Sequence, residues 1–209
     1  MKTQHEFNKD LLRWYDTNSR QFPWRKRNLS LYKVLVSEIL LWKTRAKTID
    51  SFYPRFFGIY PNKRSLKESS IEDLTRVLQP LGLQNRRAKM LKSVAAGTFR
   101  KRITDEQSFR KLFGIGQYVA RATLAIYYDV HIVPVDENIR RLLKRVFDFS
   151  IRNIRSISKD EDLFLKELIN KEHKKVIWAM IDHSSMVCTR DNPACSTCTF
   201  SNYCKFCLD

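Results

Sequence analysis

Glycine and proline are scarce in this chain, whose 209 residues include five glycines and six prolines. These residues are the usual points at which helices end and turns form, so their scarcity favours a helical fold. No uninterrupted apolar run approaches the roughly 20 residues that a membrane-spanning helix needs. Internal repeats and low-complexity linkers are missing as well. These absences argue against an integral membrane protein and a repeat array.

Acidic residues are also few: the chain has 22 Asp and Glu against 39 Lys and Arg, which gives a formal net charge of +17. A surplus of this size, spread along the chain, indicates a polyanionic partner, since neutralising phosphates releases counterions and drives association. Nucleic acid is the first candidate, and the alternative is a basic protein without such a partner. Residues 1–16 lack the apolar segment of a secretory signal, so we expect a cytoplasmic, nucleoid-associated protein in which disulfides are rare.

The cysteines lie near the C-terminus, and four of them follow the spacing C-x6-C-x2-C-x5-C: Cys188, Cys195, Cys198 and Cys204. Four thiolates so close together indicate a metal centre, because burying each one is costly unless it binds a cation. Structural zinc sites usually combine two C-x2-C pairs, whereas only Cys195 and Cys198 form such a pair here. The spacing therefore favours a [4Fe-4S] cluster over zinc. Cys207 is expected to be a free surface thiol.

Apolar residues recur at helical spacing in most segments, which predicts an all-α fold. The first amphipathic helix is marked by Phe7, Leu11, Leu12 and Tyr15. A buried helix covers 32–41, and Ser70 with Asp73 has the spacing of a capping box that opens a helix ending near 80–82. Further helices are expected at 85–98, 106–112, 117–128, 137–147, 160–170 and 172–186. We expect two helical lobes, one formed by about 30–130 and the other by about 1–29 with 131–209.

A G-I-G turn lies between two of these helices, within residues 112–120. Two glycines around one apolar residue allow positive φ angles and leave backbone N–H groups exposed at a helix start, where they can bind a phosphate. The residues concerned are Gly114, Ile115, Gly116 and Gln117. Alone, the turn is equally consistent with a plain helix–turn–helix corner. In the following segment V-P-V-D-E-N-I-R-R, Asp136 is either a helix N-cap or a functional carboxylate.

The hairpin, the V-D-x-N-x-x-R segment and the cysteine spacing together resemble the helix-hairpin-helix DNA glycosylases that carry an iron-sulfur loop. The resemblance covers nearly the whole chain and extends to F-P-W-R at 22–25, S-E-I-L-L at 37–41 and G-L with R-A at 82–88. It implies a DNA-binding cleft between two helical lobes and a [4Fe-4S] cluster in the loop 188–204. The implied partner is double-stranded DNA containing a mismatch or a damaged base, and we expect a monomer.

The resemblance also implies roles for three residues. Asp136 would stand at the cleft mouth, where an ionised carboxylate stabilises the positive charge that develops on the sugar as an N-glycosidic bond breaks. Glu38 would line the base pocket and assist departure of the base by proton transfer or water activation. Family members that also nick DNA have a lysine nucleophile where this chain has Tyr118. A phenol cannot form an imine, so base removal without strand cleavage is expected.

The chain departs from the family pattern at three points, of which the first two bear on the substrate and the third, Phe113, alters only the entry to the turn. The segment L-W-K-T at 41–44 is closer to the L-R-R-T of thymine mismatch glycosylases than to the L-Q-Q-T of adenine glycosylases. Trp42 or Lys43 would fill the gap left by a flipped nucleotide; the alternative is that Trp42 is a core residue. The sequence ends soon after Cys204, without the extra domain that reads 8-oxoguanine. Phe113 stands where the family hairpin has proline. The first two features favour a monofunctional thymine or uracil glycosylase acting opposite guanine; the alternatives are an adenine glycosylase acting on A·G or A·8-oxoguanine, a glycosylase for another damaged base, or an inactive DNA-binding relative.

Overall fold

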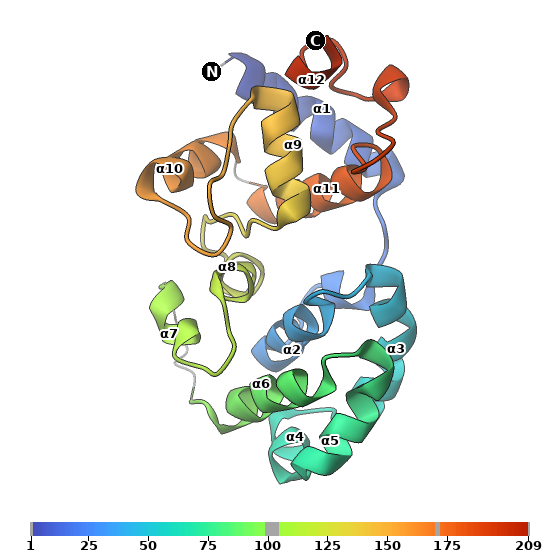
Figure 1. The fold of residues 1–209 in the computed structure, drawn as a ribbon, viewed down its shortest axis with the longest axis vertical. Coiled ribbons are helices and arrows are strands. Elements are labelled where there is room, and N and C mark those ends of the chain that lie inside the picture. The colour runs from blue at the N-terminus through green and yellow to red at the C-terminus, as the bar shows by residue number, and fades with distance from the viewer. Residues whose placement is uncertain (1, 99–104, 170–171, 209) are drawn as a thin grey trace. The chain divides into compact units, whose positions relative to one another are not determined.

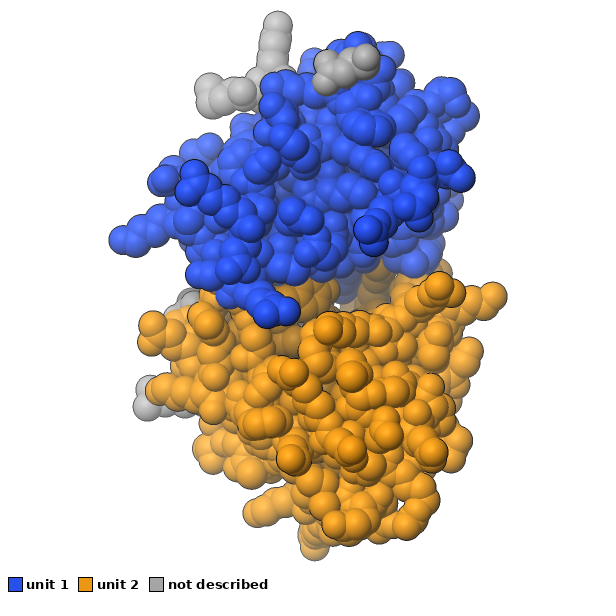
Figure 2. All heavy atoms as spheres, viewed as in Figure 1, with its two compact units in different colours: residues 1–20, 131–209 blue, residues 21–130 orange. Residues whose placement is uncertain are grey.

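The computed structural model describes residues 2–98, 105–169 and 172–208, and every regular element within these ranges is a helix (Figure 1). The predicted all-α class is therefore confirmed. None of the helices in these ranges has the length and apolar character that crossing a bilayer requires. The chain divides into two compact units, drawn in separate colours in Figure 2: unit 1 comprises residues 1–20 and 131–209, and unit 2 comprises residues 21–130. The first boundary thus lies at 20/21 and not near 30.

Unit 1 joins the two ends of the chain in one core. Its elements are α1 (Lys2–Asn18), α9 (Glu137–Phe147), α10 (Lys159–Leu168), α11 (His173–Met186), the 3₁₀ turn η3 (Cys195–Thr197) and α12 (Lys205–Leu208). The ring of Phe7 packs against those of Phe147 and Phe200, with centroids 5.0 and 4.8 Å apart. The buried carboxylate of Asp182 accepts hydrogen bonds from Arg20 N and Nε at 3.0 and 2.7 Å. These contacts attach the N-terminal segment to the C-terminal half.

Unit 2 is built around one apolar helix. Its elements are η1 (Pro23–Arg25), α2 (Leu31–Leu41), α3 (Ala46–Ile59), α4 (Lys63–Glu68), α5 (Ile71–Leu78), η2 (Gln79–Leu81), α6 (Gln84–Ala96), α7 (Glu106–Arg110) and α8 (Gln117–Ile126). Residues 34–40 of α2 are all buried, and the helix packs against α3, α6 and α8. Burying each large apolar side chain contributes about 1.5–3 kcal/mol, so the apolar residues of α2 stabilise unit 2.

Helix starts follow the sequence signals closely, whereas three helices lie where the pattern predicts none. Ser70 is the N-cap of α5: its hydroxyl accepts from Asp73 N at 3.0 Å and donates to the Asp73 carboxylate at 2.7 Å. The helices without a sequence prediction are α3, α4 and the short α12. Pro54 lies inside α3, where a proline removes one backbone hydrogen bond and costs about 3 kcal/mol. The buried aromatic side chains of α3, among them Phe52 and Phe56, offset that cost.

Candidate functional site

The hairpin turn between α7 and α8 uses its two glycines differently. Gly114 has a φ of 74°, and a Cβ there would lie 2.5 Å from Cγ of Met90. Gly116 has a φ of −85°, so the expected positive φ is found at the first glycine alone. A Cβ at Gly116 would meet no atom within 4 Å, and its absence leaves the N-terminus of α8 open. Gly114 therefore shapes the turn, and Gly116 keeps the helix start accessible.

The side chains around this turn divide into buried and exposed ones. Ile115 and Gln117 are buried, and the Ile115 backbone N–H donates to the Leu112 carbonyl oxygen at 3.2 Å, so a phosphate at this turn would meet the backbone N–H groups at the start of α8. Tyr118 is half-buried in the first turn of α8. Phe113 places an aromatic ring on the surface of the hairpin, and its backbone N–H donates to Ser93 Oγ at 2.9 Å.

The helix that carries Glu38 packs against the helix that carries Tyr118. Glu38 lies on α2, and its side chain is 5% exposed among the buried residues of that helix. α8 contacts α2 directly. Unit 2 thus brings together the helices of two predicted site residues, whereas Asp136 belongs to unit 1.

A buried arginine that the sequence did not mark as functional ties two loops of unit 2 together. Arg87 of α6 is fully buried; its Nη1 donates to the carbonyl oxygens of Leu81, at 2.8 Å, and Gly82. Its Nη2 donates to the carbonyl oxygen of Trp42 and the hydroxyl of Thr44. One guanidinium therefore joins the loop after α2 to the loop before α6. Burial lowers the pKa of Arg87, and the carbonyl dipoles around it compensate its charge.

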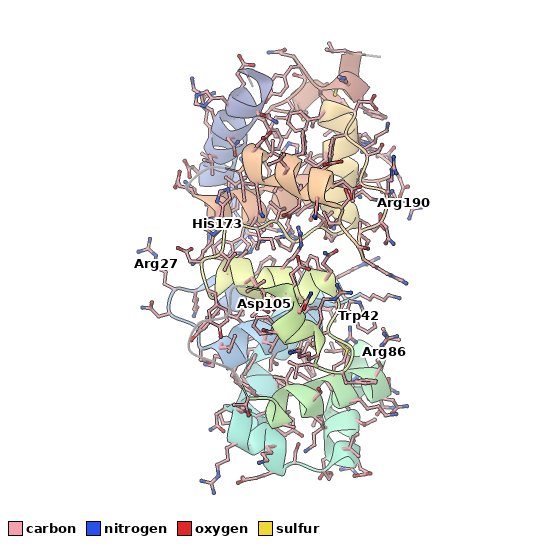
Figure 3. The ribbon with its side chains drawn as sticks, turned by 90° about the vertical axis from the view of Figure 1, so that its left-hand side faces the viewer. Arg27, Trp42, Arg86, Asp105, His173 and Arg190 are labelled. Atoms are coloured by element: carbon pink, nitrogen blue, oxygen red, sulfur yellow. The ribbon has the colours of Figure 1, made fainter. Side chains whose placement is uncertain are left out.

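The two loops contain strained backbone and a cation-flanked aromatic ring. Lys43 and Leu83 have φ angles of 54° and 52°, which are uncommon for residues other than glycine. Trp42 is half-buried, so it lies outside the core, contrary to the alternative prediction. The Arg86 guanidinium lies 5.0 Å from the Trp42 ring centroid, and both residues are labelled in Figure 3. The Lys43 ammonium lies 5.4 Å from the same centroid. Cation–π attraction of this kind holds the ring in one place beside positive charge.

Asp136 in unit 1 is the N-cap of α9. Its Oδ1 accepts from the backbone N–H groups of Asn138 and Ile139 at 3.0 and 2.8 Å, and its Oδ2 accepts from the Asn138 side chain at 3.0 Å. Burial raises the pKa of Asp136, whereas these hydrogen bonds and Arg141 act to lower it. The side chain is still partly exposed. The predicted cap role is therefore present, on a carboxylate that is less well solvated than a surface group.

Arg141 connects this carboxylate to the cysteine segment. Its Nη2 donates to Asn138 Oδ1 at 3.1 Å and to the Ser184 carbonyl oxygen at 2.8 Å. Its Nε donates to the Cys188 carbonyl oxygen at 3.0 Å. Because Asn138 also bonds Asp136, a continuous chain of hydrogen bonds runs from Asp136 to the first cysteine.

The four predicted metal ligands line one common space in unit 1. Arg145 Nη1 and Phe200 N donate to the sulfurs of Cys188 and Cys198, each at 3.5 Å, as expected around metal-bound thiolates. Burial, reinforced by the neighbouring cysteines, raises the pKa of Cys198 to about 11, so a thiolate there needs a compensating cation. Cys207 lines the same space and is half-buried, contrary to the predicted surface position.

The four cysteines supply the number and kind of ligand that a [4Fe-4S] cluster takes. Among the described residues, no group of three or more His, Cys, Asp or Glu side chains is placed to hold a single metal ion. A cube of four irons holds one thiolate at each iron and so keeps its ligands apart. The shared space and the donors aimed at the sulfurs therefore suit the predicted [4Fe-4S] group.

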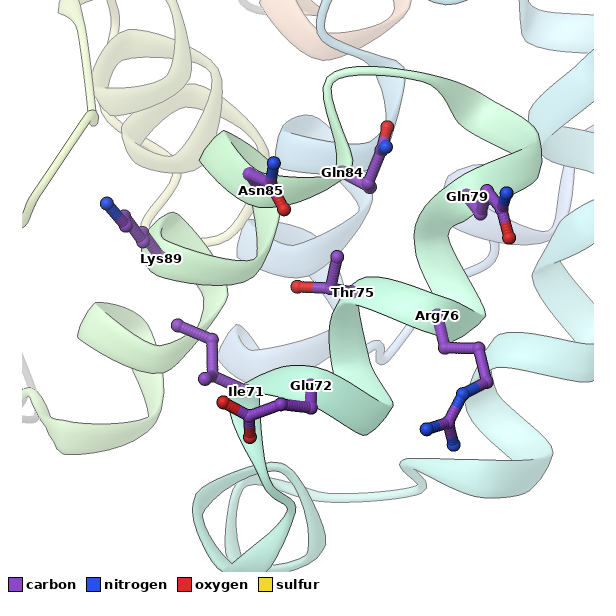
Figure 4. A pocket seen from close by; sticks show the side chains of 8 residues that line it. All are labelled: Ile71, Glu72, Thr75, Arg76, Gln79, Gln84, Asn85 and Lys89. Carbon is purple, nitrogen blue, oxygen red and sulfur yellow. The ribbon is translucent and has the colours of Figure 1, made fainter.

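An open groove in unit 2 lies apart from all of these residues. It runs along α5 and the start of α6, and Figure 4 shows its mixed lining, which includes Glu72, Arg76 and Lys89. None of the predicted site residues contributes to this groove, so it is not part of the candidate site.

The sequence matches the HhH-GPD superfamily of base excision DNA repair proteins over residues 36–160, which is more than half of the chain. The chain belongs to this superfamily. As an HhH-GPD protein with the predicted fold and motifs, it is a DNA N-glycosylase, so the predicted family and enzyme class are confirmed.

Individual relatives of this HhH-GPD protein fall in two groups. The thymine/uracil-DNA glycosylase of Pyrobaculum aerophilum is 29% identical over 94% of this chain and 89% of its own length. The adenine DNA glycosylase of Buchnera aphidicola subsp. Schizaphis graminum is 30% identical over 97% of this chain but 60% of its own length. The structure of a thermostable thymine-DNA glycosylase superposes with a TM-score of 0.87 at 25% identity, covering 99% of this chain and 97% of that one.

Proposed function

We propose that this HhH-GPD protein removes thymine or uracil mispaired with guanine and leaves an abasic site without cutting the strand. The observation that carries the proposal is Tyr118 in the first turn of α8, where a glycosylase that also cuts DNA needs an amine. Similarity to a thymine/uracil-DNA glycosylase along most of both chains supports the choice of base. The loop residues Trp42 and Lys43, which differ from the adenine pattern, support it as well.

Asp136 is assigned the stabilisation of the transition state. Loss of the base leaves positive charge on the sugar, and a fixed carboxylate nearby lowers the energy of that state. The three hydrogen bonds to Asp136 orient it before the reaction, so little reorganisation is needed. Because burial weakens its solvation, the carboxylate gains more from an approaching cation than a surface aspartate would.

Glu38 is assigned proton transfer. Either protonation of the departing base or activation of the attacking water requires a carboxyl group held in a protected environment. The side chain is almost fully buried on an apolar helix, which provides such an environment. Glu38→Gln should therefore lower the rate of base excision while leaving duplex binding intact, and an unchanged rate would contradict the assignment.

Trp42 is assigned the space that a flipped nucleotide leaves in the duplex, and Lys43 beside it is the alternative. An apolar wedge between bases offsets part of the unstacking cost. Trp42→Ala should weaken binding to mismatched duplex more than binding to matched duplex, with the helical content unchanged. Lys43→Ala is the matched variant in the same loop, and it should weaken binding to both duplexes alike because it removes a charge. Unchanged affinity of the Trp42 variant for mismatched duplex would contradict the assignment.

The C-terminal cysteines are assigned to a [4Fe-4S] cluster, with Cys188, Cys195, Cys198 and Cys204 as ligands. When bound, the cluster supplies a rigid cross-link within residues 188–204 and positive charge that compensates the thiolates. Protein groups also support the ligands: Arg145 and the Phe200 backbone N–H donate to the sulfurs of Cys188 and Cys198, and Arg141 donates to the Cys188 carbonyl oxygen. Absorbance near 400 nm with matching iron and sulfide content tests the assignment.

The deciding experiment is excision from labelled duplexes containing T·G, U·G, A·G, A·8-oxoguanine or T·A, each worked up with and without alkali. We expect strand breaks at T·G and U·G only after alkali, and none with Asp136→Asn. Breaks without alkali would refute the argument from Tyr118. Preference for A·8-oxoguanine or A·G would assign an adenine glycosylase, and binding without excision of any base would indicate an inactive relative.

A further inference from the structure

Cys207 is a fifth cysteine beside the proposed cluster ligands, and the assignment above leaves it without a role. α12 begins directly after Cys204, and the Cys207 backbone N–H donates to the Cys204 carbonyl oxygen at 3.0 Å. Residues three apart share one face of a helical turn. Both side chains therefore leave α12 toward the same space, which all five cysteines line.

The Cys207 thiol lies within interaction range of two of the four proposed ligands, Cys195 and Cys204. Cys188 and Cys198 have partners from other elements, the Arg145 guanidinium at 3.5 Å and the His183 imidazole at 3.6 Å, and Cys204 Sγ donates to the Arg145 carbonyl oxygen at 3.3 Å. The fifth thiol thus lies on one side of the ligand set, where it can reach either of two neighbours.

The helix that carries Cys207 is fixed in place. α12 packs against α9, and the Arg145 guanidinium lies 4.5 Å from the Phe206 ring centroid. Arg145 also donates to the carbonyl oxygens of Thr189, at 2.6 Å, and Arg190, at 2.9 Å. One side chain therefore holds both the start of the cysteine segment and the helix of the fifth thiol, so Cys207 stays close to the ligands.

We propose that Cys207 is an exchangeable ligand, whose thiolate replaces that of Cys195 or Cys204 on the cluster. In the exchange the Cys207 thiol loses a proton as its sulfur binds iron, and the displaced thiolate takes up a proton. No electron is transferred, so the step needs no oxidant or reductant. The consequence is that the cluster survives the loss of either neighbour. The proposal rests on the [4Fe-4S] assignment and adds a fifth residue to it.

The test compares alanine variants at each ligand position, with Cys207 present and with Cys207→Ala. Alanine is used because a serine oxygen could itself bind iron. Iron and acid-labile sulfide per chain are measured on the full-length protein after anaerobic reconstitution. We expect Cys195→Ala and Cys204→Ala to keep most of the iron and to lose it in the double variants. Cys188→Ala and Cys198→Ala are the matched controls and should lose iron in both backgrounds.

The outcomes separate this proposal from the function proposed above. Equal iron loss in all four single variants would overturn it, and so would iron retention that does not depend on Cys207. Iron loss in Cys207→Ala alone would overturn it as well, because Cys207 would then be a permanent ligand. A wild-type protein without iron and sulfide would instead refute the cluster assignment. The Cys195 and Cys204 arms are independent, so one variant that fails to fold leaves the other decisive.

Discussion

Replacing Arg87 with methionine measures how far two loops depend on one buried guanidinium. Methionine keeps much of the apolar stem but removes the donors to Leu81, Gly82, Trp42 and Thr44. Four acceptors that lose their donor cost about 1 kcal/mol each where loops near the surface can admit water, or about 4 kcal/mol in total. Relief of the guanidinium's desolvation returns about 1–2 kcal/mol. The free energy of unfolding should fall by about 2–3 kcal/mol.

Urea unfolding followed by circular dichroism provides the assay, with the slope against urea concentration checked for constancy. Arg86→Met is the matched control, because it removes the same charge from an exposed neighbouring position and should change stability by about 0.5 kcal/mol or less. Arg87→Lys keeps the charge, but a single ammonium cannot span both loops as a planar fork does. We expect it to recover less than half of the loss. Equal stability of the methionine variants at 86 and 87 would refute the reasoning.

Activity gives a second readout that stability alone does not explain. At a temperature where the Arg87→Met variant is fully folded, release of the loop that carries Trp42 should lower the single-turnover rate on a T·G duplex by roughly tenfold or more, since small misplacements are costly in catalysis. This expectation rests on the proposed function. A folded variant with the wild-type rate would show that the guanidinium stabilises unit 2 without positioning the loop.

Three further predictions concern single side chains. The pKa of Asp136 is raised in the folded state, so the wild-type protein loses stability as pH rises and this carboxyl ionises. Asparagine does not ionise, so thermal melts should show Asp136→Asn gaining stability relative to wild type from acid to neutral pH. Ser93→Ala should cost about 0.5–1.5 kcal/mol in urea unfolding, because Phe113 N loses its acceptor. Tyr118→Lys should yield a borohydride-trapped protein–DNA adduct, which the wild type should not.

Helix boundaries were predictable where the signal is local. α9 begins at Glu137 and ends at Phe147, as expected, because Asp136 caps it and apolar residues recur along it. α3 was not predictable from the same signals, since Pro54 argues against a helix and only tertiary burial of its aromatic face overrides that preference. Sequence patterns describe what a segment prefers alone, and they miss elements whose stability comes from their neighbours.

The site was predictable only in part, for a different reason. Cysteine spacing marked the ligand set, but nothing in the sequence marks Arg87 as buried, because its acceptors are mostly backbone carbonyl oxygens, and those of Leu40 and Trp42 are more than 40 residues away. Arg141 is similar: its partners at Ser184 and Cys188 are also carbonyl oxygens. Every residue has a backbone carbonyl, so the residue types in the sequence do not show which carbonyl oxygens accept such hydrogen bonds. The position of Cys207 was missed because a single cysteine has no spacing to interpret.

α9 explains why the catalytic carboxylate and the cysteine segment should respond to each other. Its first turn is capped by Asp136, and Arg141 and Arg145, four residues apart and hence on one face, bond the backbone of residues 184–190. Loss of the cluster would free that backbone and remove partners from both arginines. Arg141 would then hold Asn138 less firmly, and Asn138 is one of two residues that orient Asp136. If the proposed cluster is present, excision should therefore depend on it through these hydrogen bonds.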